Sequence, residues 1–416
     1  METVSPDGLI GEDHPARTLW SVAEALDLSA FYTSIRSVKG KAGRDATDPR
    51  LLVALWLYAA TRGVGSARQL ARFCEESDPY KWLCGGVSLN HHTLSDFRVS
   101  HADALDKLFT QVLAKLCEQG LVKVYRISQD GTRVRACAGT KTFRRRERLD
   151  ILLGQAKSHV AALRKQIDDP AASAGLSSKQ KAARERAARE RQKRIEAAMA
   201  ELPELEARQA KRAKTVSKKD REAGKIRKPR VSTTDPDARV MKMPDGGFRP
   251  AVNVQLACDT QSRAIVGVDV TNRGVDTDQD EPMRQQVEER TGQKVHEHLV
   301  DGGYLRLANV EKAEADEVTM YAPPKPPRNK KLRGTEYEPR PEDSEAIRRW
   351  RERMGSEEGQ EIYRQRCSTV ETVNGDLKTH RGLGQLTVRG LGKARCIALW
   401  SALAYNLMHF TEALLT

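Results

Sequence analysis

The sequence contains little that would suit a membrane protein or a secreted protein. Its most apolar runs, residues 51–60 and 398–415, are too short or too often interrupted by polar residues to span a bilayer. No charged segment followed by an apolar run opens the chain, so we expect no signal peptide. The 7 cysteines form no Cys-x-x-Cys pair, and Cys74 and Cys84 have no His or Cys partner at zinc spacing. These absences predict a cytoplasmic protein with reduced cysteines.

Negative charge is also in deficit, because 57 Asp and Glu residues stand against 71 Lys and Arg residues. The formal net charge of +14 indicates a polyanionic partner, either nucleic acid or an anionic membrane surface. The absence of a membrane segment favours nucleic acid. With 416 residues, the chain is long enough for two or three domains.

Residues 1–120 are expected to form a helical, DNA-binding N-terminal domain. Helical periodicity predicts helices at residues 20–28, 49–62 and 66–76, and two more between residues 93 and 117. Short helices near residues 66–74 and 93–98, joined by tight turns, suit a helix-turn-helix-like DNA reader that includes Arg98. The alternative is a small helical bundle in which His91, His92 and Trp82 are ordinary packing or loop residues.

The first strand signal leads to an acidic residue. Residues 122–128 alternate between apolar and polar with period two and are followed by Gln129-Asp130-Gly131-Thr132. This pattern predicts a strand that runs into a turn, with Asp130 placed to reach into a cleft at the edge of the sheet. The alternative is simple turn chemistry, since Asp-Gly is a common turn dipeptide. Asp130 alone favours the turn.

Residues 142–230 form a basic segment that contains no aromatic residue after Phe143. Apolar residues recur at steps of four and three, the spacing of a coiled-coil seam, at Leu149, Leu153, Ala156, Val160, Leu163 and Ile167. A second helical run carries Ile195 to Leu205. We expect an inserted antiparallel helical hairpin with its tip at residues 171–178. The tail at residues 211–230 either becomes ordered on DNA or is a solvated spacer.

Strand signals return in the second half of the chain. The pattern predicts a hairpin of strands at residues 251–259 and 264–271, a helix at 280–291, strands at 295–300 and 318–321, and helices over 344–382 and 394–415. The strand at 295–300 ends in Asp301-Gly302-Gly303. Two strands that each end in Asp-Gly suit divalent-metal coordination better than two coincidental turns.

An amphipathic helix from Tyr363 to Lys378 carries a third acid. Tyr363, Val370, Val373 and Leu377 are expected to face inward, while Arg366, Glu371 and Lys378 project towards one side. This side can supply one carboxylate to a metal and cations to a polyanion. The alternative is a solvated helix face with intrahelical ion pairs.

The order of these elements predicts an α/β, ribonuclease H-like mixed sheet flanked by helices, formed by residues 121–141 and 231–416. The chain resembles a DDE transposase of a bacterial insertion sequence, in the branch with an InsH-type helical N-terminal domain and a ribonuclease H-like catalytic domain. The resemblance is carried by residues 92–98, 130–132, 232–239, 253–255, 301–304 and 363–378. One spacing differs. The residues Cys367 to Val370 separate Arg366 from Glu371, one more than in the Tyr-Arg-Glu-Lys helix of related elements.

The resemblance implies a transposase that binds the ends of a mobile element and catalyses strand cleavage and strand transfer. Asp130, Asp301 and Glu371 would hold two Mg²⁺ ions, with Mn²⁺ as a substitute. Arg366, Lys378, Tyr363 and Arg98 would contact DNA. Asp235 and Asp237 are expected to act as cap or turn residues rather than metal ligands.

The implied partners are double-stranded DNA, as terminal inverted repeats and target, and further copies of the chain, as a homodimer or higher oligomer. The implied location is the bacterial cytoplasm, on the nucleoid when bound to DNA. No membrane partner is expected. Two other functions stay open: a DNA-binding remnant that no longer catalyses, and a metal-dependent nuclease without strand transfer.

Overall fold

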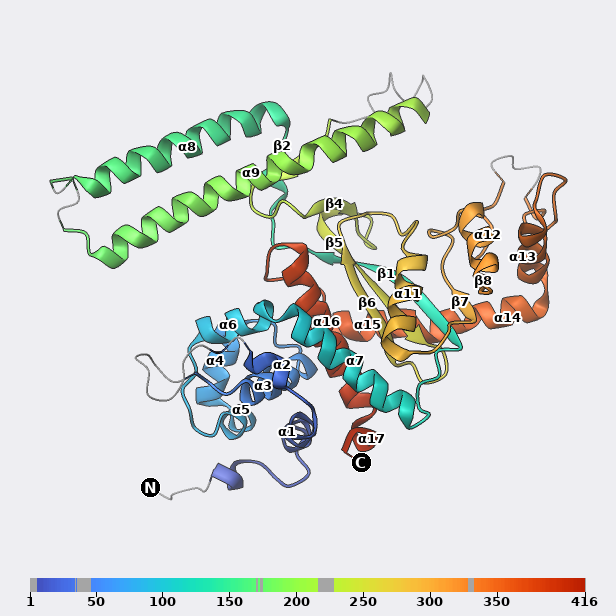
Figure 1. The fold of residues 1–416 in the computed structure, drawn as a ribbon, viewed down its shortest axis with the longest axis horizontal. Helices are drawn as coiled ribbons and strands as arrows, with labels where there is room; N and C mark the ends of the chain where they lie inside the picture. Colours follow the sequence, from blue (N-terminus) through green and yellow to red (C-terminus); the bar gives the residue numbers. More distant parts are fainter. Residues whose placement is uncertain are drawn as a thin grey trace. The chain divides into compact units, whose positions relative to one another are not determined.

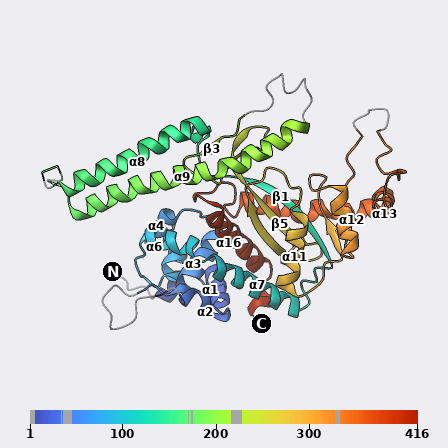
Figure 2. The same ribbon diagram turned by 45° about the horizontal axis from the view of Figure 1, so that its top comes forward.

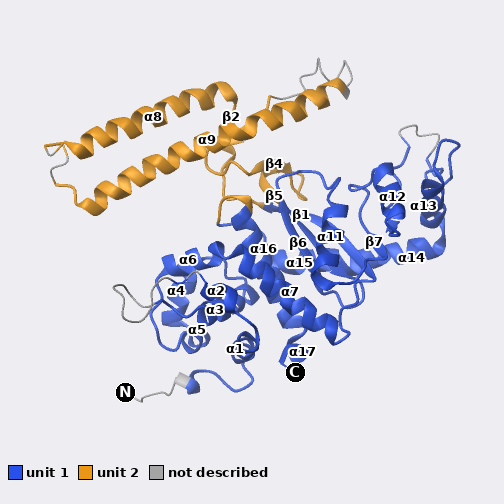
Figure 3. Cartoon of the chain, viewed as in Figure 1, with its two compact units in different colours: residues 1–134, 253–387, 392–416 blue, residues 135–252, 388–391 orange. Residues whose placement is uncertain are grey.

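The computed structural model describes residues 6–33, 35, 46–169, 171–172, 175–215, 228–327 and 333–415. It divides into two compact units, shown in different colours in Figure 3: residues 1–134, 253–387 and 392–416 form unit 1, and residues 135–252 and 388–391 form unit 2. Most of the basic tail at residues 211–230, and parts of the expected hairpin tip and of the loop at 323–333, lie outside the described residues.

Unit 1 begins with the helical N-terminal region (Figure 1). A 3₁₀ helix at Pro6–Leu9 precedes α1 (Pro15–Ala25), α2 (Ser29–Tyr32), α3 (Pro49–Thr61), α4 (Ala67–Glu76), α5 (Asp78–Leu83), α6 (His91–Ser100) and α7 (Ala102–Glu118). Two of these helices have side-chain N-caps, because the side chains of Asp48 and Ser66 accept hydrogen bonds from the backbone N–H groups of Arg50 and Gln69. The predicted helical character of this region is confirmed.

The sheet of unit 1 has the order β6–β5–β1–β7–β8. Its strands are β1 (Arg126–Arg135), β5 (Phe248–Asp259), β6 (Ile265–Thr271), β7 (Glu297–Leu299) and β8 (Thr319–Tyr321), and the unit boundaries fall within β1 and β5. β7 pairs in parallel with β1 and β8, while β5 and β6 are antiparallel. The helix α11 (Asp280–Thr291), which has the predicted bounds, packs on β6 (Figures 1 and 2). This mixed sheet flanked by helices confirms the predicted fold class.

β1 differs from its prediction. It runs from Arg126 to Arg135, so Asp130 and Gly131 lie in the middle of the strand and not in a turn. The glycine has a packing role there, because a Cβ at Gly131 would lie 2.0 Å from Asp276 Oδ1 and 2.3 Å from Gln255 Nε2. The Asp-Gly pair therefore reflects the close approach of two buried side chains, which sequence alone does not distinguish from a turn.

Two helices near β8 precede the C-terminal helices. The elements are α12 (Leu307–Ala315), α13 (Glu345–Gly355), α14 (Glu357–Arg366), a π-helical segment (Cys367–Glu371), α15 (Thr372–Thr379), α16 (Leu391–His409) and α17 (Thr411–Leu415). The helical stretch predicted over residues 344–382 is divided at Ser356, whose side chain caps α14 by accepting from the Gly359 N–H. No helix among the described residues has both the length and the hydrophobicity needed to cross a membrane.

Unit 2 contains the predicted helical hairpin. It comprises α8 (Arg146–Asp168) and α9 (Ser178–Thr215), with β2 (Phe143–Arg144) paired to β3 (Val231–Ser232), and β4 (Arg239–Lys242) paired to the first residues of β5. The two helices lie side by side in Figures 1 and 2. Leu149 and Ala156 of α8 are buried with Ile195 and Leu202 of α9, which confirms the predicted apolar seam.

Candidate active site

Two acids lie at the same level of neighbouring parallel strands, Asp130 within β1 and Asp301 just after β7. In the β1–β7 ladder, Ser128 lies opposite Leu299, and Asp130 and Asp301 each lie two residues further along the chain. Because parallel strands advance together, both acids reach the same side of the ladder. Asp301 Oδ1 accepts a hydrogen bond of 2.6 Å from the Gly303 N–H, which fixes this carboxylate in the turn after β7.

An arginine joins the third acid to the first. The guanidinium of Arg366 donates to Asp130 Oδ1 at 2.8 Å and to Glu371 Oε1 at 2.5 Å. The Arg366 side chain is only 9% exposed, whereas that of Glu371 is 45% exposed. Arg366 is therefore an internal bridge between β1 and the helix, and Glu371 keeps an accessible side.

The π-helical segment explains how Arg366 and Glu371 meet. They are five positions apart, and in a regular α-helix five residues sweep about 500°, which would turn Glu371 about 140° away from Arg366. The wider turn at Cys367–Glu371 takes up the additional residue and returns Glu371 to the face of Arg366. The unusual spacing in the sequence is therefore compatible with both residues acting at one site.

Three more side chains of this helix lie near the acids. The Asn374 Nδ2 group donates to Asp130 Oδ2 at 2.9 Å. Burial lowers the pKa of Lys378, and the nearby negative charge of Asp130 opposes this shift. Burial raises the pKa of Tyr363, which also lies in the fields of Arg366 and Asp301. The predicted contacts Tyr363 and Lys378 thus lie at the site, and Asn374 is an addition.

Negative charge is crowded around Asp130. Burial raises the pKa of this carboxyl to about 6; the positive charge of Arg366 opposes the shift, and the negative charges of Asp301, Asp276 and Glu371 add to it. Repulsion among carboxylates is the electrostatic condition that a bound cation relieves. The positive charge of Arg366 already relieves part of this repulsion.

A buried polar network lies beside Asp130. Asp276 Oδ1 accepts hydrogen bonds of 2.7 Å from both Asn253 Nδ2 and Gln255 Nε2, and Gln255 Oε1 accepts from Tyr304 and, at 2.9 Å, from Gln129. Sequence reasoning named 253–255 only as a matching stretch. The sequence feature that could have indicated this network is the pair Asn253 and Gln255, two polar residues on the same face of an otherwise apolar strand. Polar side chains on a buried face need hydrogen-bond partners. Asp276, in a loop, offered no such signal.

The donor set suits a hard divalent cation by its chemistry, since carboxylate oxygens are the ligands that Mg²⁺ prefers. No three His, Cys, Asp or Glu side chains converge closely enough to hold a metal in the part of the chain that the structure describes. Arg366 occupies the position between Asp130 and Glu371. Mg²⁺ commonly uses only one or two carboxylates together with water and substrate phosphates. The carboxylates are therefore chemically suited to bind Mg²⁺. The guanidinium of Arg366 would compete with the ion for Asp130 and Glu371.

Comparison with known protein families agrees with this geometry. Residues 230–407 match the transposase DDE domain family, and residues 5–100 match the transposase domain family DUF772. The chain belongs to the DDE transposases. No curated protein and no solved structure matches it. Members of the DDE transposase family generally use a divalent metal and bind DNA.

The family match covers two of the three acids of this transposase. Asp301 and Glu371 lie within residues 230–407, whereas Asp130 precedes the matched range. Asp130 is connected to them by the parallel β1–β7 ladder and by the bridge to Arg366. Asp130 is therefore connected to the matched domain by contacts in the structure and not by the family match.

The remaining site candidates of the transposase have local partners. Arg98 in α6 donates to the Gly65 carbonyl, and its guanidinium lies 4.5 Å from the ring centroid of Trp56. Burial lowers the pKa of Arg98 to about 10. These contacts place the guanidinium against the helical region, and a DNA contact by Arg98 stays a prediction without structural support.

Asp235 and Asp237 make cap-like contacts within unit 2. An Asp235 carboxylate oxygen accepts from the Gly390 N–H at 3.2 Å, and one of Asp237 accepts from the Leu391 N–H at 2.9 Å. These backbone groups lie at the start of α16. The contacts agree with the expectation of a cap for both aspartates.

Proposed function

We propose that this transposase binds the ends of a mobile element and catalyses metal-dependent DNA strand cleavage and strand transfer at Asp130, Asp301 and Glu371. The observation that supports this most is the bridge of Arg366 to Asp130 and Glu371, because it brings together acids from the two ends of the catalytic region. Asp301 adds its charge to the same cluster. A carboxyl whose pKa is raised by burial and by neighbouring carboxylates is a candidate for a functional site.

Asp130, Asp301 and Glu371 would hold two Mg²⁺ ions, with Mn²⁺ as a substitute. When bound, the metal supplies an activated water or 3′-hydroxyl and stabilises the leaving oxygen. The chain itself orients the carboxylates. Asn374 fixes one oxygen of Asp130, and the Gly303 N–H fixes one oxygen of Asp301.

Two cationic residues and a tyrosine beside the acids would bind the DNA backbone. Lys378 is half-buried next to Asp130, and Tyr363 lies near Asp301, so both suit contacts to phosphates at the cleaved end. Arg366 would contact the same phosphates when a bound metal ion replaces it as the partner of Asp130 and Glu371. The net charge of +14 supports attraction of the DNA over a longer range.

The partners we propose are double-stranded DNA, as terminal inverted repeats and target, and at least one further copy of the chain. Joining two ends at one target requires two catalytic sites, which implies a homodimer or higher oligomer in the DNA complex. The proposed location is the bacterial cytoplasm, on the nucleoid when DNA is bound.

The test uses duplexes that carry the inverted repeats flanking the gene. The variants Asp301→Ala and Glu371→Gln should bind these ends in a gel-shift assay as the unaltered chain does, and should lose Mg²⁺-dependent cleavage by about 10³-fold or more. Glu361→Gln is the matched control for Glu371→Gln, because Glu361 lies on the same helix and its side chain is 69% exposed. If Asp301→Ala cleaved DNA at an undiminished rate, the assignment of Asp130, Asp301 and Glu371 as the catalytic acids would be wrong.

The same assay separates transposition from simple nucleolysis. With a supercoiled plasmid as target, the transposase should join labelled ends to the plasmid. Cleavage without joined product would indicate a nuclease without strand transfer. Binding without cleavage by the unaltered chain, in both Mg²⁺ and Mn²⁺, would indicate a DNA-binding remnant.

A further inference from the structure

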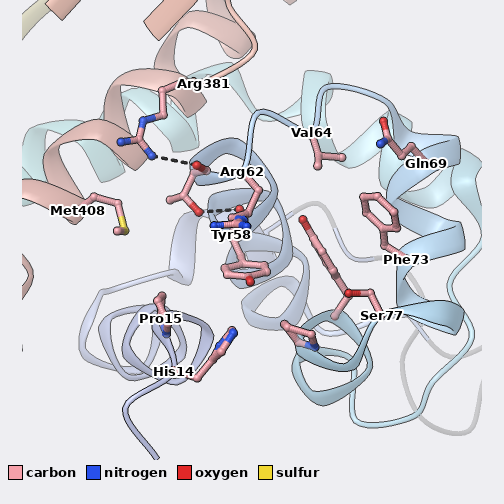
Figure 4. Close-up of a pocket in the computed structure, with 13 residues that line it drawn as sticks. His14, Pro15, Tyr58, Arg62, Val64, Gln69, Phe73, Ser77, Arg381 and Met408 are labelled. Carbon is pink, nitrogen blue, oxygen red and sulfur yellow. Dashed lines mark hydrogen bonds between the residues drawn. The ribbon is translucent and has the colours of Figure 1, made fainter. Parts of the chain in front are cut away.

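A cavity of about 640 Å³ lies in unit 1, away from the acids, between helices of the N-terminal region and the C-terminal helices. Its lining comes from the start of α1, from α3, α4 and α5, and from Arg381 and Met408 (Figure 4). A volume of this size suits a small organic ligand such as a nucleotide. The DNA strand chemistry proposed above makes no use of this cavity.

Aromatic rings form one part of the lining. The ring centroids of Tyr58 and Tyr80 are 5.0 Å apart in an edge arrangement, and those of Phe73 and Tyr80 are 5.3 Å apart and stacked. Tyr58 and Tyr80 are each 5% exposed, while Phe73 is half-buried. These rings line one side of the cavity with aromatic edges and with the half-buried ring of Phe73, against which another aromatic ring can pack.

Positive charge forms the other part. Among the described lining residues, His14, Arg62 and Arg381 are basic and none is acidic. Arg381 is held in place by Asp376 at 3.0 Å and by the Thr61 carbonyl at 2.9 Å. Arg62 forms no ion pair with any carboxylate in the described part of the chain, and Figure 4 shows it above Tyr58, with Phe73 across the cavity. An anionic group is thus the complement of this lining.

A buried hydroxyl is left without a partner in this lining. The Tyr80 Oη atom has no hydrogen-bond partner in the described residues, although the residue is almost fully buried. An unsatisfied buried hydroxyl is destabilising, and a ligand with a polar edge would offset that cost. The lining therefore presents an aromatic surface, one buried donor and acceptor, and an unpaired guanidinium.

We propose that this cavity binds a single unpaired nucleotide of DNA, with its base against Tyr58, Phe73 and Tyr80 and its phosphate on Arg62. The polar edge of the base would use the Tyr80 hydroxyl. Packing of one base against aromatic residues is tolerant of base identity, so the cavity would select for an unpaired base and not for a sequence. The inference rests on the proposed function in that it takes DNA as the ligand.

The test compares two labelled duplexes of the same sequence, one fully paired and one with a single extrahelical thymidine, bound without Mg²⁺ and measured by fluorescence anisotropy. The unaltered chain should bind the bulged duplex about ten-fold more tightly. Arg62→Gln should abolish this preference while changing the affinity for the paired duplex by less than about three-fold. Arg68→Gln is the matched control, since Arg68 is also an exposed arginine of the N-terminal region but does not line the cavity.

A second variant separates binding from folding. Tyr80→Phe removes only the unpartnered hydroxyl, so the free chain should be no less stable to urea, yet its preference for the bulged duplex should fall. Thymidine 5′-monophosphate should compete with the bulged duplex and not with the paired one. Equal losses for Arg62→Gln and Arg68→Gln on both duplexes would overturn the proposal.

The outcomes also distinguish this proposal from the proposed function. Normal binding and Mg²⁺-dependent cleavage of inverted-repeat ends, combined with equal affinity for the two duplexes, would overturn the nucleotide site alone. A chain that binds neither these duplexes nor the inverted-repeat ends would overturn both proposals.

Discussion

The guanidinium of Arg366 lies 2.8 Å from the carboxylate of Asp130, although 236 positions separate them in the chain. With side-chain exposures of 9% and 21%, the two charges are largely shielded from water. An ion pair of this kind is costly to break from one side, because the remaining charge is left buried without compensation.

Replacing Arg366 should therefore destabilise the metal-free chain. We expect Arg366→Ala to lower the free energy of unfolding in urea by about 3 kcal/mol. Mg²⁺ should recover part of this loss, because a bound cation would compensate the same carboxylates. Arg364→Ala is the control, since the Arg364 side chain is 67% exposed and should contribute less than about 1 kcal/mol. A similar loss in both variants would contradict the buried-bridge interpretation.

The π-helical segment leads to a deletion test. Removing Ser368, an exposed residue within Cys367–Glu371, should convert the segment to regular α-helix and keep Arg366 and Glu371 on one face, now four positions apart. We expect this variant to retain its melting temperature and its Mg²⁺-dependent cleavage of inverted-repeat ends.

A neighbouring deletion provides the contrast. Removing Thr372, which is also exposed, can be absorbed only by moving Glu371 relative to Asn374 and Lys378. Cleavage should then be lost. If the Ser368 deletion were as inactive as the Thr372 deletion, the π-helical segment would have a role beyond absorbing one residue.

Periodicity predicted the elements of this fold well where burial alternates regularly. The bounds of α11, the β5–β6 hairpin and the seam of the α8–α9 hairpin follow from local pattern, because each element buries one regular face. The prediction of Asp130, Asp301 and Glu371 as site residues used the glycine or cationic residues that accompany them, and it stays a prediction.

Features set by tertiary packing were not predictable in this way. Local sequence cannot reveal that Asp276 packs against Gly131, nor that Asn374 donates to Asp130 from a distant helix. The π-helical segment depends on where Arg366 must end to reach β1. Each of these features is determined by contacts between residues far apart in the chain. Secondary-structure propensity depends only on residues that are close in sequence.

Gly131 provides a direct test of this packing. We expect Gly131→Ala to lower the free energy of unfolding by at least about 2 kcal/mol, because the new methyl group would displace Asp276 and Gln255 from their buried hydrogen bonds. Gly154→Ala should have the opposite sign. Gly154 lies within α8 with nothing within 4 Å of an added Cβ, so alanine should stabilise the helix by about 0.5–1 kcal/mol. Equal effects in urea denaturation would contradict the predicted close contact.

His298 should make the chain sensitive to acid. Burial, assisted by the positive charge of Arg284, lowers its pKa from 6.5 to about 3, and neither ring nitrogen has a partner among the described residues. At His298 the unfolded chain therefore binds one more proton between these values, so the contribution of His298 to the free energy of unfolding should fall by up to about 1.4 kcal/mol per pH unit as the pH drops below 6.5. The raised pKa of Asp130 contributes in the opposite direction and is the same in the unaltered chain and in the histidine variants. His298→Leu should remove this dependence from urea titrations between pH 6.5 and 4, whereas replacing the exposed His296 by leucine should preserve it.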